Sequence, residues 1–351
     1  MRYLLVIDTA GDVVLADADN GVRMPIGEPL APAQRSRVSS AVWSPGGEWT
    51  AWSVDSDDLD GVDQLRCHDE ETDRWWVLAE SVKAFYLCPS PGGRWLSHLS
   101  PGPLGLELAL SEIGTGDSRI VERGQPMFWS WSPDEARLAI HVEDRVVISD
   151  VDGSGVELLR DGVGPFVTPW WLPGGSVAYV VDDRIVSEGP DGLVTTLVER
   201  GVTGRFSPDP EGRRMAHIER FDGGHRLVVV DLLSGELRVV AADPIGPFFW
   251  SPSGDRLAAL VDATEGRVRW LVFDGADLAS LPPFRPGRSW AGSVLPFFEQ
   301  YAQSHAHWSP DGRRLVAPAV GDDGAPGALI QDLDDADRQQ WIADVELVWW
   351  A

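Results

Sequence analysis

The sequence has little cysteine, a single lysine and no long apolar segment. Its 351 residues include only Cys67 and Cys88, which are too few for a disulfide framework and do not match the spacing of a zinc site. No apolar run reaches the roughly 18 residues of a membrane-spanning helix. The apolar residues 3–7 are too few for the core of a signal peptide. We therefore expect a cytoplasmic protein.

Positive charge is also scarce. The chain has 29 Lys and Arg residues against 55 Asp and Glu residues, which gives a formal net charge of −26. Nucleic-acid binding requires a basic surface that displaces counterions from phosphates, and an anionic membrane surface attracts basic segments. The composition therefore excludes nucleic acid and membrane as partners and leaves proteins and small molecules.

What the sequence does have is a repeat. An aromatic residue followed by Ser-Pro and a Gly-containing turn recurs seven times, with some variation, and its proline stands at positions 45, 91, 133, 173, 208, 252 and 310. The intervals are 46, 42, 40, 35, 44 and 58 residues. Periods of about 40–45 residues are typical of β-propeller blades.

Each repeat unit has the pattern of four short antiparallel strands, with the turn after Ser-Pro joining the first strand to the second. At the N-terminus, residues 3–8, 12–17 and 22–26 resemble second, third and fourth strands without a first. Residues 346–351 resemble a first strand without the others, so pairing the two ends would close a ring and remove open sheet edges. The sequence thus predicts one all-β domain over residues 1–351, a propeller of eight four-stranded blades. Seven blades is the alternative, if the weak unit around 173–206 forms no full sheet.

The 17 tryptophans fit this arrangement. Nine of them lie on predicted first strands, where large flat rings can fill the space between neighbouring blades. These are Trp43, Trp129, Trp131, Trp170, Trp171, Trp250, Trp308, Trp349 and Trp350. We expect packing rather than ligand stacking from most of them.

The repeated Trp-Ser-Pro-Asp-Gly, followed by an apolar strand, resembles the repeat of the TolB-like propeller family over the whole chain. The resemblance implies the fold but not an activity, because the repeat residues are structural and propellers of this kind serve unrelated roles. Some cap prolyl-oligopeptidase-type hydrolases. This sequence has no Gly-x-Ser-x-Gly nucleophile elbow and no α/β segment after the repeats.

One segment does not fit the repeat. Residues 282–307 form an insertion rich in aromatic and polar residues, and long loops on a rigid scaffold are usually functional or disordered. Loops that join a fourth strand to the next first strand lie opposite the Ser-Pro turns, so we expect this loop at the mouth of the central channel. An aromatic plug that only packs the mouth is the alternative.

Basic residues are concentrated in these same loops, so the channel mouth should be the least negative surface. We therefore expect it to accept a peptide or a small anionic ligand. The candidate ligand-binding residues are Trp290, Tyr301, His305, His307, Arg285, Arg288 and Lys83.

His305-Ala306-His307 is the strongest candidate for chemistry. Two His residues at i and i+2 on a strand point to the same side and could reach a metal, with Gln303 as a third group. The similar propeller-fold oligogalacturonate lyases bind manganese through a Gln and His cluster that includes such a pair. Here no other His lies on a first strand to complete the cluster. The acidic loop at 55–63 misses the calcium-loop spacing by one residue.

The repeat, the loop and the isolated His pair favour a non-catalytic scaffold that binds a protein or a ligand at the channel mouth and needs no cofactor. The alternatives are a metal-dependent lyase or a hydrolase-type enzyme that uses His305 and His307, and an accessory subunit of a separately encoded partner.

Overall fold

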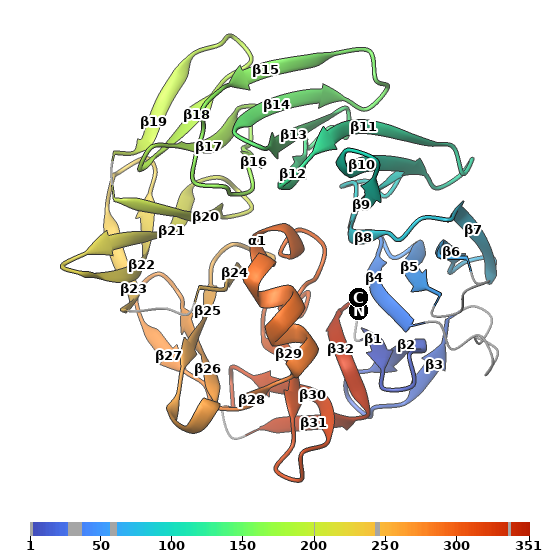
Figure 1. Ribbon diagram of the computed structural model, residues 1–351. Coiled ribbons are helices and arrows are strands. Elements are labelled where there is room, and N and C mark those ends of the chain that lie inside the picture. The colour runs from blue at the N-terminus through green and yellow to red at the C-terminus, as the bar shows by residue number, and fades with distance from the viewer. Residues whose placement is uncertain (1–2, 27–36, 57–61, 200, 243–245, 336–337) are drawn as a thin grey trace.

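Short antiparallel strands arranged in a ring make up almost all of the fold. The computed structural model describes residues 3–26, 37–56, 62–199, 201–242, 246–335 and 338–351. Within these ranges the strands form eight four-stranded antiparallel sheets around a central space (Figure 1). The predicted propeller with eight blades is confirmed, and the weak unit does form a full blade, although its first strand is only two residues long.

The two ends of the chain share one blade, as the sequence predicts. It consists, from the centre outward, of β32 (Val345–Trp350), β1 (Tyr3–Asp8), β2 (Val13–Asp17) and β3 (Arg23–Pro25). Val348 lies opposite Val6 in the antiparallel register. Both side chains are fully buried, so the last strand closes the ring through apolar packing as well as backbone hydrogen bonds.

The other seven blades follow in chain order. Blades two to five consist of β4 (Arg37–Trp43), β5 (Trp49–Asp55), β6 (Gln64–Asp69) and β7 (Arg74–Glu80); β8 (Phe85–Pro89), β9 (Trp95–Gly102), β10 (Gly105–Glu112) and β11 (Ser118–Gly124); β12 (Met127–Trp131), β13 (Arg137–Val142), β14 (Arg145–Asp150) and β15 (Val156–Arg160); and β16 (Trp170–Trp171), β17 (Val177–Val181), β18 (Arg184–Glu188) and β19 (Val194–Val198). Blades six to eight consist of β20 (Val202–Pro208), β21 (Arg214–Phe221), β22 (Gly224–Asp231) and β23 (Leu237–Ala242); β24 (Phe248–Trp250), β25 (Leu257–Asp262), β26 (Val268–Phe273) and β27 (Leu278–Ser280); and β28 (Arg285–Pro286), β29 (Arg314–Val320), β30 (Pro326–Asp332) and β31 (Gln339–Ala343).

The repeated serine has a structural role. In five of the Ser-Pro turns its hydroxyl oxygen accepts a hydrogen bond from the backbone N–H five residues later, over 2.9–3.0 Å. The side chain thereby satisfies a backbone donor that would otherwise be lost in the turn between the first and second strands. The recurrence of Ser-Pro is therefore explained by turn geometry.

The tryptophans of the repeat join neighbouring blades. The indole N–H of Trp250 donates to the carbonyl oxygen of Ser207 in the preceding blade over 3.1 Å, and Trp308 donates to Phe249 over 2.9 Å. Trp131 makes the same contact with Cys88 over 3.3 Å. Each bond ties the first strand of one blade to the first strand of the blade before it, which agrees with the predicted packing role.

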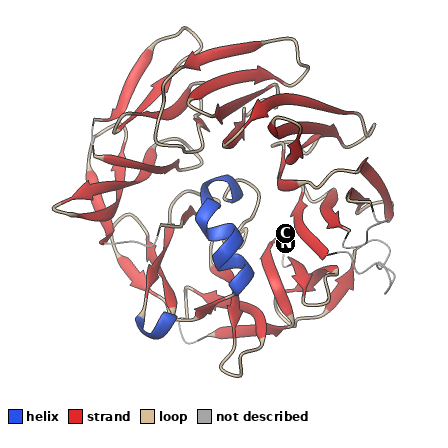
Figure 2. Ribbon diagram, in the orientation of Figure 1, coloured by secondary structure: helices blue, strands red, loops and turns tan. Residues whose placement is uncertain are grey.

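The insertion fills the centre of the ring. It runs through a π-helix (Trp290–Val294), a 3₁₀ turn (Leu295–Phe297) and α1 (Phe298–Tyr301), and these coils lie inside the ring of strands (Figures 1 and 2). We call residues 287–304 the plug. The sequence places this segment in a loop before the first strand of its blade, whereas in the structure it interrupts that strand. β28 pairs with one end of β29, and Trp308 bridges to Leu315 at the other end.

The described residues also include one 3₁₀ turn (Thr264–Gly266) between β25 and β26. No helix in these ranges is long and apolar enough to cross a membrane.

Candidate functional site

The plug divides the central channel between two faces. We call the face that carries the loops from each fourth strand to the next first strand the mouth face. The opposite face carries the Ser-Pro turns, and we call it the turn face. Phe297 and Glu299 of the plug line a cavity on the mouth face, whereas Gln303 of the plug and the following His305 line a cavity on the turn face. The residues predicted as one site are therefore spread over both faces.

Trp290 and His307 belong to the core. Trp290 is 1% exposed and packs against Trp270 and Phe284, with ring centroids 6.2 and 6.5 Å apart. The imidazole of His307 lies 5.2 Å from the Trp290 ring, and its Nδ1 is 3.0 Å from the carbonyl oxygen of Val316. Burial lowers the pKa of His307 to about 4, so the ring is neutral near pH 7.

His305 is also buried, and like His307 it borders a cavity. Its ring lies 4.2 Å from Trp349 and 4.8 Å from Tyr301, and its Nδ1 is 2.8 Å from the hydroxyl of Ser304. Burial, assisted by the neighbouring His307, lowers its pKa to about 3. Tyr301 in turn makes an edge-on contact with Tyr86 at 5.0 Å.

The predicted basic residues lie further out. Arg285 and Arg288 are exposed and line a cavity of about 530 Å³ at the edge of the mouth face. Lys83 is exposed and its Nζ is 3.5 Å from a carboxylate oxygen of Asp55. None of these three side chains lines the cavity formed by Tyr86, Phe128 and Phe297, and their role in ligand binding stays a prediction.

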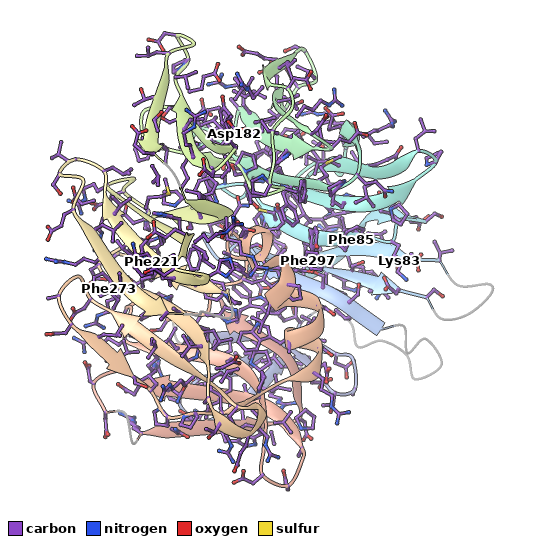
Figure 3. All side chains as sticks on the ribbon, turned by 60° about the vertical axis from the view of Figure 1, so that its left-hand side comes forward. Lys83, Phe85, Asp182, Phe221, Phe273 and Phe297 are labelled. Atoms are coloured by element: carbon purple, nitrogen blue, oxygen red, sulfur yellow. The ribbon has the colours of Figure 1, made fainter. Side chains whose placement is uncertain are left out.

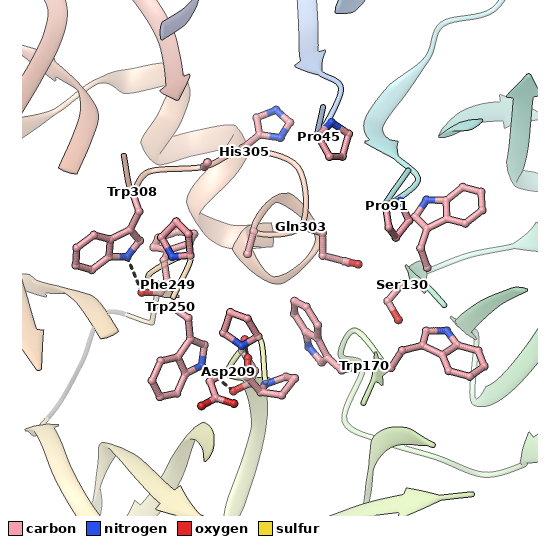
Figure 4. Close-up of a pocket in the computed structure, with 18 of the residues that line it drawn as sticks. Pro45, Pro91, Ser130, Trp170, Asp209, Phe249, Trp250, Gln303, His305 and Trp308 are labelled. Carbon is pink, nitrogen blue, oxygen red and sulfur yellow. Dashed lines mark hydrogen bonds between the residues drawn. The ribbon is translucent and has the colours of Figure 1, made fainter. Parts of the chain in front are cut away.

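The turn face carries a central depression of about 630 Å³ (Figure 4). Prolines of the repeat and tryptophans of the first strands form its wall, and residues 302–308 form its floor. The Gln303 side chain donates to the backbone oxygen of Trp129 over 2.7 Å. Among the described residues, no three His, Cys, Asp or Glu side chains form a group that could hold a metal. Residues 57–61 of the acidic loop lie outside the described residues.

The mouth face carries a smaller cavity of about 400 Å³, which we call the aromatic pocket. Five rings line it, and two of them, Phe85 of β8 and Phe297 of the plug, are labelled in Figure 3. Tyr86 lies 5.8 Å from Phe297, and Phe128 lies 4.6 Å from Phe166. The lining residues are Phe85, Tyr86, Leu106, Pro126, Met127, Phe128, Pro165, Phe166, Val167, Thr203, Gly204, Arg205, Pro296, Phe297 and Glu299.

Irregular first strands position this lining. In β8 the pairing with β9 shifts between Phe85 and Cys88, and Tyr86 has a φ of 51°. In β20 the pairing with β21 shifts between Val202 and Phe206, so residues 203–205 leave the regular ladder. Bulges and left-handed backbone conformations in residues other than glycine are concentrated near functional sites, because they redirect side chains at an energetic cost.

Two ionisable side chains, Glu299 and Arg205, line the pocket. Glu299 is 6% exposed, and one of its carboxylate oxygens, Oε1, is buried without a hydrogen-bond partner in the described part of the chain. Burial raises its pKa to about 8, although Arg205 and the backbone N–H of Phe206 act in the opposite direction. The guanidinium of Arg205 lies 5.5 Å from the centre of the Phe298 ring. A neutral carboxyl and a cation thus share an apolar cavity.

The sequence shows little of this pocket in advance. Its residues come from the starts of β8, β10, β12 and β20, from the segment before β16 and from the plug, and each looks like ordinary strand or loop sequence. The available signal was Phe-Tyr, Met-Phe and Pro-Phe at equivalent places in three repeats, at 85–86, 127–128 and 165–166.

This architecture defines the protein as a β-propeller, and comparisons with known proteins agree. No protein-family model matches the chain, and no curated protein matches it in sequence. Similar solved structures include a eukaryotic initiation factor (12% identity, TM-score 0.60, covering 100% of this chain and 98% of that one) and an oligogalacturonate lyase in complex with manganese (14%, 0.57, 93% and 95%).

TolB proteins are also among the structural neighbours. TolB from Acinetobacter baumannii is 13% identical, with a TM-score of 0.42 over 78% of this chain, which spans 60% of the length of that TolB chain. Identities this low show the fold and not an activity.

Proposed function

We propose that this protein is a non-catalytic propeller that binds a small apolar ligand on its mouth face. The observation that carries the proposal is the aromatic pocket. Its volume of about 400 Å³ suits a small molecule, and its wall consists of apolar rings with a few polar groups. A scaffold that binds at the channel mouth is also what the sequence favours.

The composition of the pocket supports binding rather than chemistry. Its two ionisable groups besides Tyr86 are Arg205 and Glu299, which are suited to orienting a polar group on the ligand. Phe297, which closes one side, is 42% exposed. Large exposed rings around a concave site are typical of ligand-binding surfaces.

Filling the pocket should abolish binding of an uncharged aromatic probe, naphthalenemethanol. We expect Leu106→Trp to weaken the affinity at least about tenfold, because Leu106 lines the pocket and the larger ring takes up part of its volume. Isothermal titration calorimetry on the whole chain measures the effect. Leu104→Trp is the matched control, because Leu104 is 85% exposed, lies two residues away and is not part of the pocket. Equal affinities of the two variants would contradict the proposal, as would no binding to the unmodified protein.

The second candidate is a metal-dependent enzyme on the turn face, because Gln303 and His305 line the same depression. We expect this site not to hold a metal. After incubation with manganese and desalting, the protein should retain well below one equivalent of manganese. The physical reason is that each of these side chains already has a hydrogen-bond partner. His307 lines the same depression, but its Nδ1 is bonded to Val316, and no acid or third His joins the His pair among the described residues. One retained equivalent that His305→Ala removes would instead support the enzyme.

A further inference from the structure

We infer that the aromatic pocket selects aromatic ligands that carry one carboxylate, and that this carboxylate is held between Arg205 and the Glu299 carboxyl. The inference rests on the proposed function, since it names the ligand class of the same pocket. It is carried by two polar groups whose bonding is incomplete in an otherwise apolar cavity.

Arg205 is a cation without a matching anion. It makes no ion pair within 4.0 Å with any described residue, although the chain has 55 acidic residues against 29 basic ones. The ring of Phe298 beneath its guanidinium favours a fixed position through a cation–π contact. Its planar set of N–H donors matches the two oxygens of a carboxylate.

Glu299 provides the second group. It stands on α1, which packs against β8, β12 and β20, and it is more than nine-tenths buried. Its Oε1 is buried without a partner, which costs free energy. A turn of the Glu299 side chain toward the cavity that it lines would let a ligand group supply the missing hydrogen bond. In its protonated form this carboxyl donates to a ligand oxygen, and it then adds no negative charge to the pocket.

The charge balance selects the ligand. A protonated Glu299 and one guanidinium leave the pocket with a single positive charge, which complements a monoanion. The five rings complement a flat aromatic body, which they can contact at ring edges and faces. If Glu299 were ionised instead, it would neutralise Arg205, and the pocket would favour an uncharged ligand.

Few other ionisable groups reach the site from the surrounding elements. β8 contributes Tyr86, and Tyr301 lies behind it on α1; burial raises the pKa of both phenols, so both are neutral near pH 7. β12 contributes only apolar side chains, Met127 and Phe128. His141 of β13 packs against the pocket ring Phe166 at 4.7 Å, and burial lowers the pKa of its imidazole, so it is neutral near pH 7. Between about pH 6.5 and pH 9 the site is therefore expected to titrate through Glu299, whose pKa is raised to about 8.

The test compares two probes that share one ring system. Naphthoate is ionised throughout this range, and naphthalenemethanol is uncharged. Calorimetry at about pH 6.5 should show at least about tenfold tighter binding of naphthoate to the unmodified protein. Raising the pH through about 8 should weaken naphthoate binding, because an ionised Glu299 repels the ligand and can no longer donate, while naphthalenemethanol binding should not weaken in parallel.

Three variants test whether Arg205 and Glu299 cause the preference for naphthoate over naphthalenemethanol. Arg205→Met should remove the advantage of naphthoate and change naphthalenemethanol affinity less than about threefold, and Arg205→Lys should restore part of it. Glu299→Gln keeps a neutral donor, so it should bind naphthoate near neutral pH and lose the weakening at high pH. Near-ultraviolet circular dichroism establishes that each variant is folded before its affinity is used.

The outcomes separate the two proposals. If neither probe binds, both the proposed function and this inference are overturned. If naphthalenemethanol binds and Leu106→Trp blocks it, but naphthoate has no advantage or keeps it in Arg205→Met, the pocket stands and only the carboxylate preference is overturned.

Discussion

Val348→Asp should largely unfold the protein. Val348 is fully buried in the last strand, opposite Val6 of the first, and it packs among apolar side chains of the first and last blades. The substitution removes an apolar contact and introduces a carboxylate without a buried partner, which together cost at least about 4 kcal/mol. Domains have a free energy of unfolding of about 5–15 kcal/mol, so little stability should remain. Urea unfolding followed by tryptophan fluorescence measures the loss.

The matched control carries the same new charge on an exposed outer strand. Thr195 is exposed on β19, so Thr195→Asp should change the free energy of unfolding by no more than about 0.5 kcal/mol. Val348→Ala should cost about 2 kcal/mol without adding a charge. If Val348→Asp and Val348→Ala unfold like the unmodified protein, the last strand does not close the ring.

Glu299→Gln should stabilise the protein increasingly as the pH rises. The folded-state pKa of Glu299 is raised from 4.5 to about 8, so its contribution to stability is greatest below the unfolded-state value and is lost as the pH rises toward 8. Each pH unit in this window changes the free energy by about 1.4 kcal/mol. A glutamine has no such loss, so its advantage should grow by about 3 kcal/mol between pH 6 and pH 9.

Thermal or urea unfolding across this range measures the difference between the two proteins. Glu157→Gln on the exposed outer strand β15 is the control, and its effect should not vary with pH. A constant difference between Glu299→Gln and the unmodified protein would show that Glu299 has an ordinary acidity, and the neutral carboxyl of the pocket would have to be abandoned.

The blade count could be predicted because it follows from local rules repeated many times. Ser44, Ser90 and their equivalents each close one turn within five residues, and Trp131, Trp250 and Trp308 make the same bond from blade to blade. The composite blade was predictable for the same reason, since each end of the chain lacks what the other supplies. Local consistency of this kind is what specifies a fold.

The aromatic pocket could not be predicted because it depends on departures from the repeat. Tyr86 lines the pocket because its own backbone is left-handed and the pairing of β8 with β9 shifts at this position. Residues 203–205 line it because they depart from the regular pairing of β20 with β21. Glu299 reaches it only because the plug interrupts a strand and enters the channel. A reading based on strand alternation places none of these side chains.

The expectation of a mouth site built on Arg285, Arg288 and Lys83 came from charge in neighbouring loops. Membership of a loop places a residue on one face of the propeller but does not fix its distance from the central axis. All three side chains are exposed, and none of them lines the aromatic pocket. Arg205 lies on a strand, and nothing in the sequence distinguishes it from the other arginines on strands.

A crystal structure of the protein with naphthoate tests the central claim most directly. We expect the naphthalene ring to lie among Phe128, Phe166 and Phe297, and the carboxylate of the ligand to face Arg205 and Glu299. A ligand bound instead in the tryptophan-lined depression of the turn face, or at the exposed Arg285 and Arg288, would contradict it.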